Sequence, residues 1–243
     1  MKSKNLGFTF GGCLLVVVIL GLIAGVILFT PSKNPEEANK IKLIKSTMEQ
    51  LDTAVKKVVA EYGSKGDAFN SCGSGSFEEG VLCFGDILAK NLDINKNCSN
   101  KEKSCFSKEP LKNIYGETIK DRDKASNPCI YTFILSNGVS VCIRDYSRFD
   151  IDIDGPQNGP NVRGEDNFDF VVSDNSVNYF DVDTNRYNMN EYESLSTTKN
   201  ARRDIDRAFN ANYDSVAWAV LKGNMNYLKC ADKLMWKSKV TCK

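Results

Sequence analysis

The sequence predicts an α+β fold in which one long N-terminal helix packs on a small antiparallel β-sheet with disulfide-tethered loops. Three observations predict this fold. A charge-free apolar run is followed by apolar residues three and four positions apart, as in an amphipathic helix. Later, stretches rich in β-branched and aromatic residues flank an Asn-Gly pair, which is typical of a hairpin. Eight of the nine cysteines follow the apolar run.

The first element is the apolar run GFTFGGCLLVVVILGLIAGVILF. As a helix, the 22 residues from Phe8 to Phe29 would be about 33 Å long, enough to cross a bilayer core of about 30 Å. The run is longer than the apolar part of a cleaved secretory signal, and no small-x-small cleavage site follows it. Cys13 ends a Gly-Gly-Cys triplet like that of lipoproteins, but it precedes nearly all of the apolar stretch. The run therefore predicts a transmembrane half of the N-terminal helix at residues 8–30.

The second element is the amphipathic half of the same helix, at residues 31–63. Asn34 is a good N-cap, Pro35 suits the first turn, and Glu36 and Glu37 complement the helix dipole. Gly63 ends the pattern. The apolar stripe consists of Ile41, Ile44, Met48, Leu51, Val55, Val58 and Tyr62.

Residues 64–243 are expected to form one globular domain. Residues 64–128 indicate a loop-rich, disulfide-tethered connector with one short helix in FEEGVLCFGDILAKNLDI. CIYTFILSNGVSVCIRD predicts a hairpin that turns at Asn137 and Gly138. Residues 171–212 suggest a long surface loop that could hold a helix in KNARRDIDRAFNA. Trp218 and Trp236 are expected to be core or loop anchors.

The most distinctive stretch is RFDIDIDGPQNGPNVRGEDNFDFVV, which begins as an alternation of apolar residues and aspartates. The alternation predicts a half-buried strand with a carboxylate face. The D-x-D-x-D-G spacing also opens an EF-hand loop, but Asn161 stands at the twelfth position and Pro156 interrupts the loop, so an EF-hand is excluded. Two interpretations stay open: a surface-exposed acidic strand, or a calcium site of another kind. The candidate calcium ligands are Asp152, Asp154, Asn161 and Asp166.

The cysteines beyond the apolar run indicate up to four disulfides and an oxidising compartment. The alternative, free thiols or a metal site, is disfavoured because the chain has no C-x-x-C pair and no histidine. Pairing between sequence neighbours is the simplest expectation, with Cys230 to Cys242 as its clearest case. The candidates are Cys72, Cys83, Cys98, Cys105, Cys129, Cys142, Cys230 and Cys242.

Composition disfavours catalysis and nucleic-acid binding. The absence of histidine removes the commonest general base and transition-metal ligand. Charge is balanced, with 32 Lys plus Arg against 31 Asp plus Glu, so no strong field attracts nucleic acid. We therefore expect no enzyme, no catalytic residue and no nucleic-acid partner.

The N-terminus resembles that of type IV pilins and of the pseudopilins of type II secretion. The shared features are a short basic leader, Gly7, then Phe8 and Thr9, then an unbroken span. The resemblance implies that a prepilin peptidase removes the leader, residues 1–7, and methylates the new N-terminus at Phe8. It further implies a filament subunit whose partners are other pilin or pseudopilin subunits, the peptidase, an inner-membrane assembly platform and membrane lipid. The family usually has glutamate where this chain has Gly12, which suggests altered packing and a minor subunit.

Two further blocks resemble a group of bacterial pilin-like proteins. One is the Asp-Gly block with its Gly-Pro-Asn turn, and the other is the tail, in which Asn226 stands where aspartate is usual. Pseudopilins bind calcium in a loop near their C-terminal sheet, so the resemblance implies calcium as the one candidate cofactor.

The expected location is the inner membrane, crossed once, with a cytoplasmic N-terminus and a periplasmic or cell-surface C-terminal domain. Lys2 and Lys4 support this orientation weakly, and the cysteine placement supports it more firmly. The alternative is an unprocessed single-pass protein whose outer domain binds a ligand or adheres, with calcium dependence.

Overall fold

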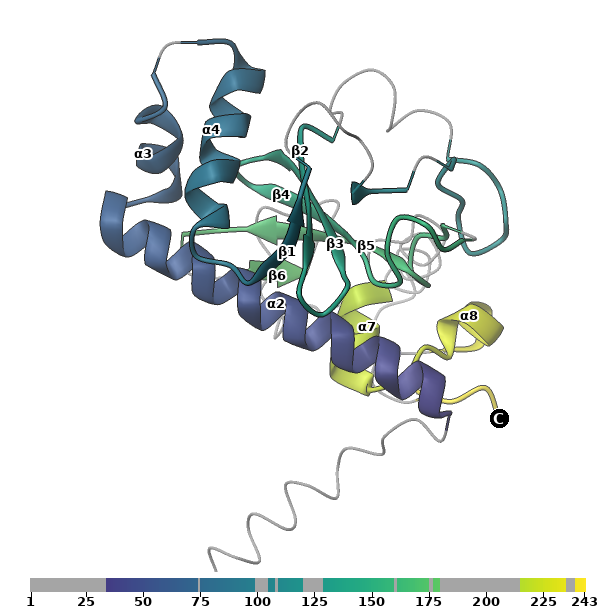
Figure 1. Ribbon diagram of the computed structural model, residues 1–243. Coiled ribbons are helices and arrows are strands. Elements are labelled where there is room, and N and C mark those ends of the chain that lie inside the picture. The colour runs from purple at the N-terminus through teal and green to yellow at the C-terminus, as the bar shows by residue number, and fades with distance from the viewer. Residues whose placement is uncertain are drawn as a thin grey trace, which may run out of the picture.

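A computed structural model of the chain describes residues 34–73, 75–98, 105–107, 109–119, 129–159, 161–174, 177–179, 215–234 and 239–243. In this part a long helix lies along an antiparallel sheet, with further helices at both ends (Figure 1). The α+β class, the sheet and the disulfides are thereby confirmed. The leader and the span expected at residues 1–30 lie outside the described residues. No described helix has the length and apolar character needed to cross a membrane.

Helix α2, Pro35–Tyr62, has the start and the end that its capping residues predict. The Asn34 side chain accepts a hydrogen bond from the Glu36 N–H at 3.1 Å, and proline occupies the first turn. At the other end the Gly63 N–H donates to the Val59 carbonyl at 2.8 Å. Gly63 has φ 91°, a left-handed conformation that costs glycine little.

The apolar stripe of α2 is buried in its own domain. Ile44, Leu51 and Val58 are fully buried, whereas Met48 and Tyr62 are only partly buried against the same core. Full burial of an aliphatic side chain contributes about 1.5–3 kcal/mol, so the stripe fixes the helix on the domain. The pattern alone did not indicate three further buried residues of α2: Glu37, Thr47 and Ala54.

The connector after α2 is more regular than expected. It contains α3, Lys65–Asn70, and α4, Phe77–Ala89, which the Cys72–Cys83 disulfide joins. A capping box formed by Ser76 and Glu79 begins α4, and this spacing is a signal that the sequence carries. Gly85 lets α4 approach the sheet, because a Cβ there would lie 2.4 Å from the Tyr131 ring. The prediction of a loop-rich connector was therefore wrong for this part.

The sheet has six antiparallel strands in sequence order, so each strand pairs with the next one along the chain. The β2–β3 hairpin turns at Asn137 and Gly138, as predicted, and Gly138 has φ 89°. The strands are β1 Ile94–Asn97, β2 Tyr131–Leu135, β3 Ser140–Asp145, β4 Arg148–Asp152, β5 Asn167–Val172 and β6 Val177–Tyr179.

Disulfides join all four pairs of neighbouring cysteines, as the simplest pairing predicts. The bonds are Cys72–Cys83, Cys98–Cys105, Cys129–Cys142 and Cys230–Cys242. Each closes a short loop, between 7 and 13 residues apart in sequence.

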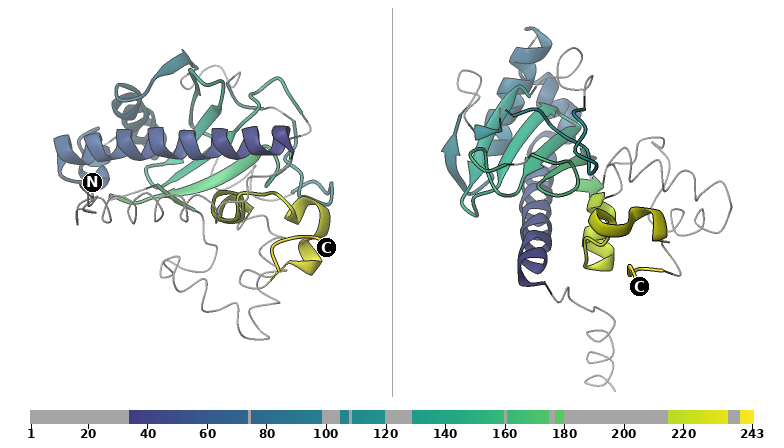
Figure 2. Two further views of the ribbon diagram at one scale, coloured as in Figure 1. Left: turned by 90° about the horizontal axis from the view of Figure 1, so that it is seen from below. Right: turned by 90° about the vertical axis from the view of Figure 1, so that its right-hand side faces the viewer.

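The C-terminal part lies at the end of the molecule where α2 begins (Figure 2). It comprises α7, Ser215–Lys222, α8, Tyr227–Cys230, and a short 3₁₀ helix, Ala231–Lys233. α7 packs against α2 and β5, and Trp218 is fully buried in the core, as expected. Trp236 and the helix expected in KNARRDIDRAFNA lie outside the described residues.

Candidate functional site

The candidate site lies on the polar face of the central strands. Side chains alternate between the two faces of a sheet, and directly paired residues share a face. One rung of the apolar face pairs Val141 with Ile151 and Ile151 with Phe168, all buried. The rungs of the opposite face are Ser140–Asp152–Asn167 and Cys142–Asp150–Asp169. Three strands thus bring polar oxygens together.

The polar face is buried, which corrects the expectation of an exposed carboxylate strand. Asp150 is 3% exposed and Asp152 is 1% exposed. The loop after β4 is joined to the segment that precedes β2: Asn161 Nδ2 donates to the Glu109 carbonyl at 2.7 Å, and Lys112 pairs with Val162. A buried carboxylate is costly unless it has a hydrogen-bond or ion-pair partner. The neighbours of Asp150 and of Asp152 therefore decide how each carboxylate is stabilised.

Arginines partner one of the two acidic rungs. Arg144 forms an ion pair with Asp150, and Arg163 Nη1 lies 3.1 Å from Asp169 Oδ2. We call these four residues the arginine-paired cluster. Burial raises the pKa of Asp150 to about 7, and the nearby Asp169 charge adds to the rise, while Arg144 and Arg163 oppose it. With two carboxylates and two guanidiniums, the cluster is formally neutral.

Among the described residues, no lysine or arginine forms an ion pair with Asp152, Asp154 or Asp166, which lie on the other rung and in the loop after it. Six residues of this rung and loop each carry a buried side-chain oxygen that has no hydrogen-bond partner among the described residues. We call these six residues the oxygen cluster. Its members are Ser140, Asp152, Asp154, Asn161, Asp166 and Asn167.

The loop of residues 153–166 is held in place by its own hydrogen bonds. Asp152 Oδ1 accepts from the Gly155 N–H at 3.1 Å, and Asp166 Oδ1 accepts from the Val162 N–H at 2.6 Å. The Ile153 N–H donates to the Asp166 carbonyl at 2.8 Å, which closes the loop. One oxygen of each aspartate is thereby fixed, and the other is the unpaired one.

Electrostatics in the oxygen cluster favour taking up positive charge. Burial raises the pKa of Asp152 to about 8; hydrogen bonding with Asp154 and the charges of Asp154 and Asp166 act in the same direction. Burial also raises the pKa of Asp166 to about 6, while the Val162 N–H and the charge of Lys40 oppose the rise. Such carboxylates are relieved by a proton or by a cation.

All four predicted calcium ligands belong to the oxygen cluster. Asn161, within the loop of residues 153–166, adopts a left-handed φ of 56°. Among the residues that the structure describes, however, no group of three or more His, Cys, Asp or Glu side chains is placed to hold a metal ion. Calcium often takes mixed oxygen ligands, so the carboxylates would need the amide, hydroxyl or main-chain oxygens beside them.

Sequence reasoning missed two members of the oxygen cluster, Ser140 and Asn167. Neither lies in the aspartate repeat, and only the register of β3 and β5 with β4 places them opposite Asp152. No local pattern marks them. The hairpin indicated that β3 pairs with β2, but not which residue of β3 faces which aspartate of β4.

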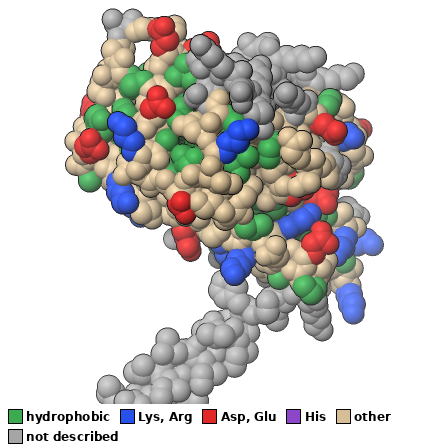
Figure 3. All heavy atoms as spheres, in the orientation of Figure 1, with side chains coloured by type: hydrophobic (Ala, Val, Ile, Leu, Met, Phe, Trp, Pro, Cys, Tyr) green, Lys and Arg blue, Asp and Glu red, His purple; other side chains and the backbone are tan. Residues whose placement is uncertain are grey.

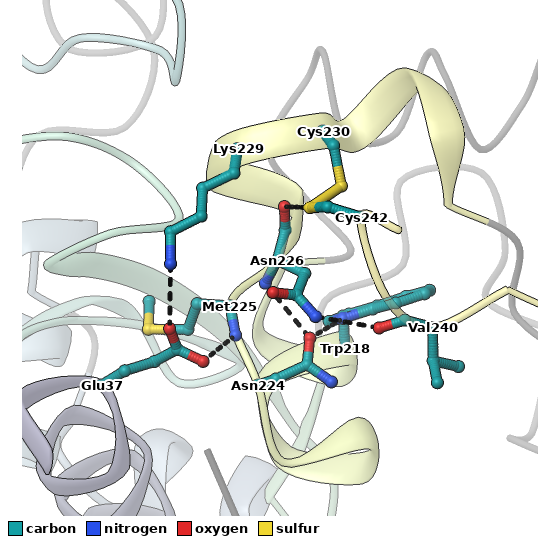
Figure 4. Close-up of a disulfide and its surroundings, with 9 residues drawn as sticks. All are labelled: Glu37, Trp218, Asn224, Met225, Asn226, Lys229, Cys230, Val240 and Cys242. Carbon is teal, nitrogen blue, oxygen red and sulfur yellow. Dashed lines mark hydrogen bonds and ion pairs between the residues drawn. A yellow bond between two sulfur atoms is a disulfide. The ribbon is translucent and has the colours of Figure 1, made fainter. Parts of the chain in front are cut away.

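A second feature ties the C-terminal tail to the first turn of α2 (Figure 4). Buried Glu37 accepts from the Met225 N–H at 2.9 Å, and its other oxygen lies 3.7 Å from Lys229 Nζ. The carboxylate also lies at a helix N-terminus, where negative charge is favourable. These contacts fix the tail to the first turn of α2.

The loop of the oxygen cluster reaches the same end of the molecule. The Tyr227 hydroxyl donates to the Gly164 carbonyl at 2.6 Å, and Lys40 of α2 lies 3.5 Å from Glu165. Loop, tail and helix start are therefore connected. Gly7 and Phe8, where processing is expected, lie outside the described residues. Comparisons with protein-family models, curated proteins and solved structures found no match to this chain.

Proposed function

We propose that the protein is a structural subunit, with the features of a minor one, of a type IV pilus or of a type II secretion pseudopilus-like filament. The observation that carries the proposal is the placement of α2. Its first residue, Pro35, follows the end of the apolar run by only a few positions, and its stripe is buried in the sheet domain. The helix that is fixed on the globular domain therefore begins close in sequence to the expected span.

This arrangement leaves the membrane half of the helix for intermolecular contacts. Because Ile44, Leu51 and Val58 are used within the domain, they are not free to pack with neighbours. Apolar spans can exchange lipid contacts for contacts with one another. The subunit would wait in the inner membrane and enter the filament by its span, without catalysis. Gly12 removes the usual carboxylate from that packing.

Mass spectrometry of the N-terminus of the mature protein from its native membrane tests the proposal. We expect a chain that begins at N-methylated Phe8. A Gly7→Val variant should retain the leader, because the peptidase cuts after a glycine. Gly11→Val, four positions further on, is the matched control and should be processed normally. An intact Met1 in the wild-type protein would overturn the proposal and favour an unprocessed, membrane-anchored binding protein.

The oxygen cluster favours a second candidate function, calcium binding, in either kind of protein. Its support is the set of unpaired buried oxygens on Asp152, Asp154 and Asp166. The oxygens of Asn161 and the other amide and hydroxyl members could complete a hard, mixed ligand set. The bound ion would add positive charge beside aspartates that form no ion pair among the described residues, and it would hold the loop against the sheet.

Calorimetric titration of the full chain in detergent with calcium chloride tests this candidate. We expect heat of binding and a rise in melting temperature with calcium, and a smaller response to magnesium, which demands stricter octahedral geometry. A titration without heat and without gain in thermal stability would rule out calcium binding but would not contradict the filament proposal.

A further inference from the structure

The C-terminal segment carries a charge asymmetry that the balanced composition hides. Residues 215–243 contain one acidic residue, Asp232, against six lysines. The whole chain has a net charge of only +1, so the remainder of the chain is net acidic. The lysines are Lys222, Lys229, Lys233, Lys237, Lys239 and Lys243.

The described lysines of the tail lie together because the tail is folded back on itself. The Cys230–Cys242 disulfide and the hydrogen bond from Asn226 Nδ2 to the Val240 carbonyl, 2.9 Å long, hold residues 239–243 against α8 (Figure 4). Lys229, Lys233 and Lys243 are exposed. Blue side chains gather at this end of the surface, where α2 begins (Figure 3).

The position of this end follows from the length of the chain, and it rests on the proposed function. Asn34, the N-cap of α2, is four residues beyond residue 30, where the expected span ends. Four residues extend over at most about 14 Å. The tail contacts the first turn of α2 through Glu37, whose carboxylate lies 3.7 Å from Lys229 Nζ. On this proposal Lys229 lies within about one or two Debye lengths, of about 8 Å each, from the bilayer surface, and the disulfide-closed tail brings Lys233 and Lys243 to the same end of the molecule.

We propose that the lysine-rich end of the tail docks on anionic lipid headgroups of the leaflet that the globular domain faces. Lysine carries a flexible, strongly hydrated point charge, which suits headgroup phosphates without a defined pocket. Among the described residues of the tail, Val240 is the one exposed large apolar side chain, at 37%, and the attraction that these residues support is electrostatic. Docking would hold the domain in one orientation on the membrane before assembly, and extraction of the subunit would break it.

Tryptophan fluorescence can follow the docking, because both tryptophans, Trp218 and Trp236, lie in the tail. The full chain is reconstituted in vesicles of neutral phosphatidylcholine, or of phosphatidylcholine with about one third phosphatidylglycerol, each with a trace of dansyl-labelled headgroup. We expect stronger energy transfer to dansyl in the anionic vesicles, and a loss of this excess at high salt. In the Lys233→Gln/Lys243→Gln variant the docking constant should fall roughly fivefold per lysine.

The matched control is Lys56→Gln/Lys57→Gln, which removes the same charge near the far end of α2. These exposed lysines are about 33 Å along the helix from Asn34, beyond the reach of surface charge, so the control should transfer energy like the wild type. Melting temperatures of both variants check that the fold is unchanged.

Three outcomes would overturn the inference. Equal energy transfer in neutral and anionic vesicles would mean that the membrane span alone sets the distance between the tryptophans and the labelled headgroups. Transfer that rises with protein density in neutral vesicles would assign the lysines to the acidic surface of a second copy. A chain that alkaline carbonate strips from the vesicles would overturn the inference together with the proposed function, whereas a chain that stays inserted but ignores lipid charge overturns the inference alone.

Discussion

Asp150 and Asp152 stand two positions apart on β4, face the same way and are both buried, yet their surroundings differ. Asp150 contacts Arg144 and lies beside the Asp169–Arg163 pair. Asp152 has one oxygen fixed by the Gly155 N–H, whereas its other oxygen has no donor among the described residues and lies close enough to Asp154 for a hydrogen bond when one of the two carboxyls is protonated. Within the described part of the chain, one rung carries its own counter-charge and the next rung does not.

This difference separates a structural role from a candidate binding role. Breaking a compensated buried ion network destabilises the fold, because a charge is left without a partner. An uncompensated group of oxygens already carries that cost and gains from any cation or donor that reaches it. The exposed fraction of the side chain is small for both aspartates, so it does not distinguish their roles.

The largest expected effect is that of removing a cation from the arginine-paired cluster. Arg163→Met should lower the free energy of unfolding by about 3–5 kcal/mol, because Asp169 loses the guanidinium 3.1 Å away. At about 2–4 °C per kcal/mol, calorimetry should show a melting temperature roughly 10 °C lower. Arg148→Met, at the exposed start of β4, is the control. Equal melting temperatures for the two variants would show that the network needs no second arginine.

The next largest expected effect is the gain in stability with calcium, which should depend on the oxygen cluster and not on the arginine-paired cluster. At a calcium concentration of about 100 times its dissociation constant, linkage predicts a gain of about 2.7 kcal/mol in stability. Asp152→Asn should lose most of this gain, whereas Asp93→Asn, an exposed aspartate, should keep it. Melting curves with calcium and with a chelator give the comparison. A gain that Asp152→Asn retains in full would place calcium elsewhere.

Without calcium, Asp150→Asn and Asp152→Asn should change stability in opposite directions. Asparagine at 152 keeps the acceptor for the Gly155 N–H and replaces the unpaired oxygen with a donor for Asp154. We expect it to stabilise by about 1 kcal/mol. At 150 the same change weakens the ion pair with Arg144 and should destabilise by about 1–3 kcal/mol. Denaturant unfolding in a chelator measures both; changes of the same sign would contradict the comparison.

The smallest expected effect concerns Ser140, whose hydroxyl has no partner within the described part of the chain. Ser140→Ala should change stability by less than about 1 kcal/mol in a chelator, since no hydrogen bond is lost. If the hydroxyl contributes to calcium binding, the variant should weaken calcium affinity in calorimetry. Thr132→Ala, on the neighbouring strand of the same face, serves as the control and should leave affinity unchanged.

Elements with local signals were predictable. Asn34, Pro35 and Gly63 define α2 because caps act within one turn, and Asn137–Gly138 defines the β2–β3 hairpin because the turn sets its own geometry. α4 was expected from its apolar stretch, but α3 and β1 were not, since short elements in a polar, cysteine-rich stretch depend on tertiary packing.

The candidate site likewise combines features with local sequence signals and features that depend on tertiary packing. The sequence by itself determined the long helix and its stripe, the hairpin, the alternating aspartates and the short cysteine spacings, because each arises from interactions between residues close in the chain. Only the tertiary structure decided that both Asp150 and Asp152 are buried, that arginines reach the first, and that Ser140 and Asn167 stand beside the second. The reason is physical: whether a buried charge is compensated depends on strand register and on loops from distant positions, and neither leaves a local pattern in the sequence.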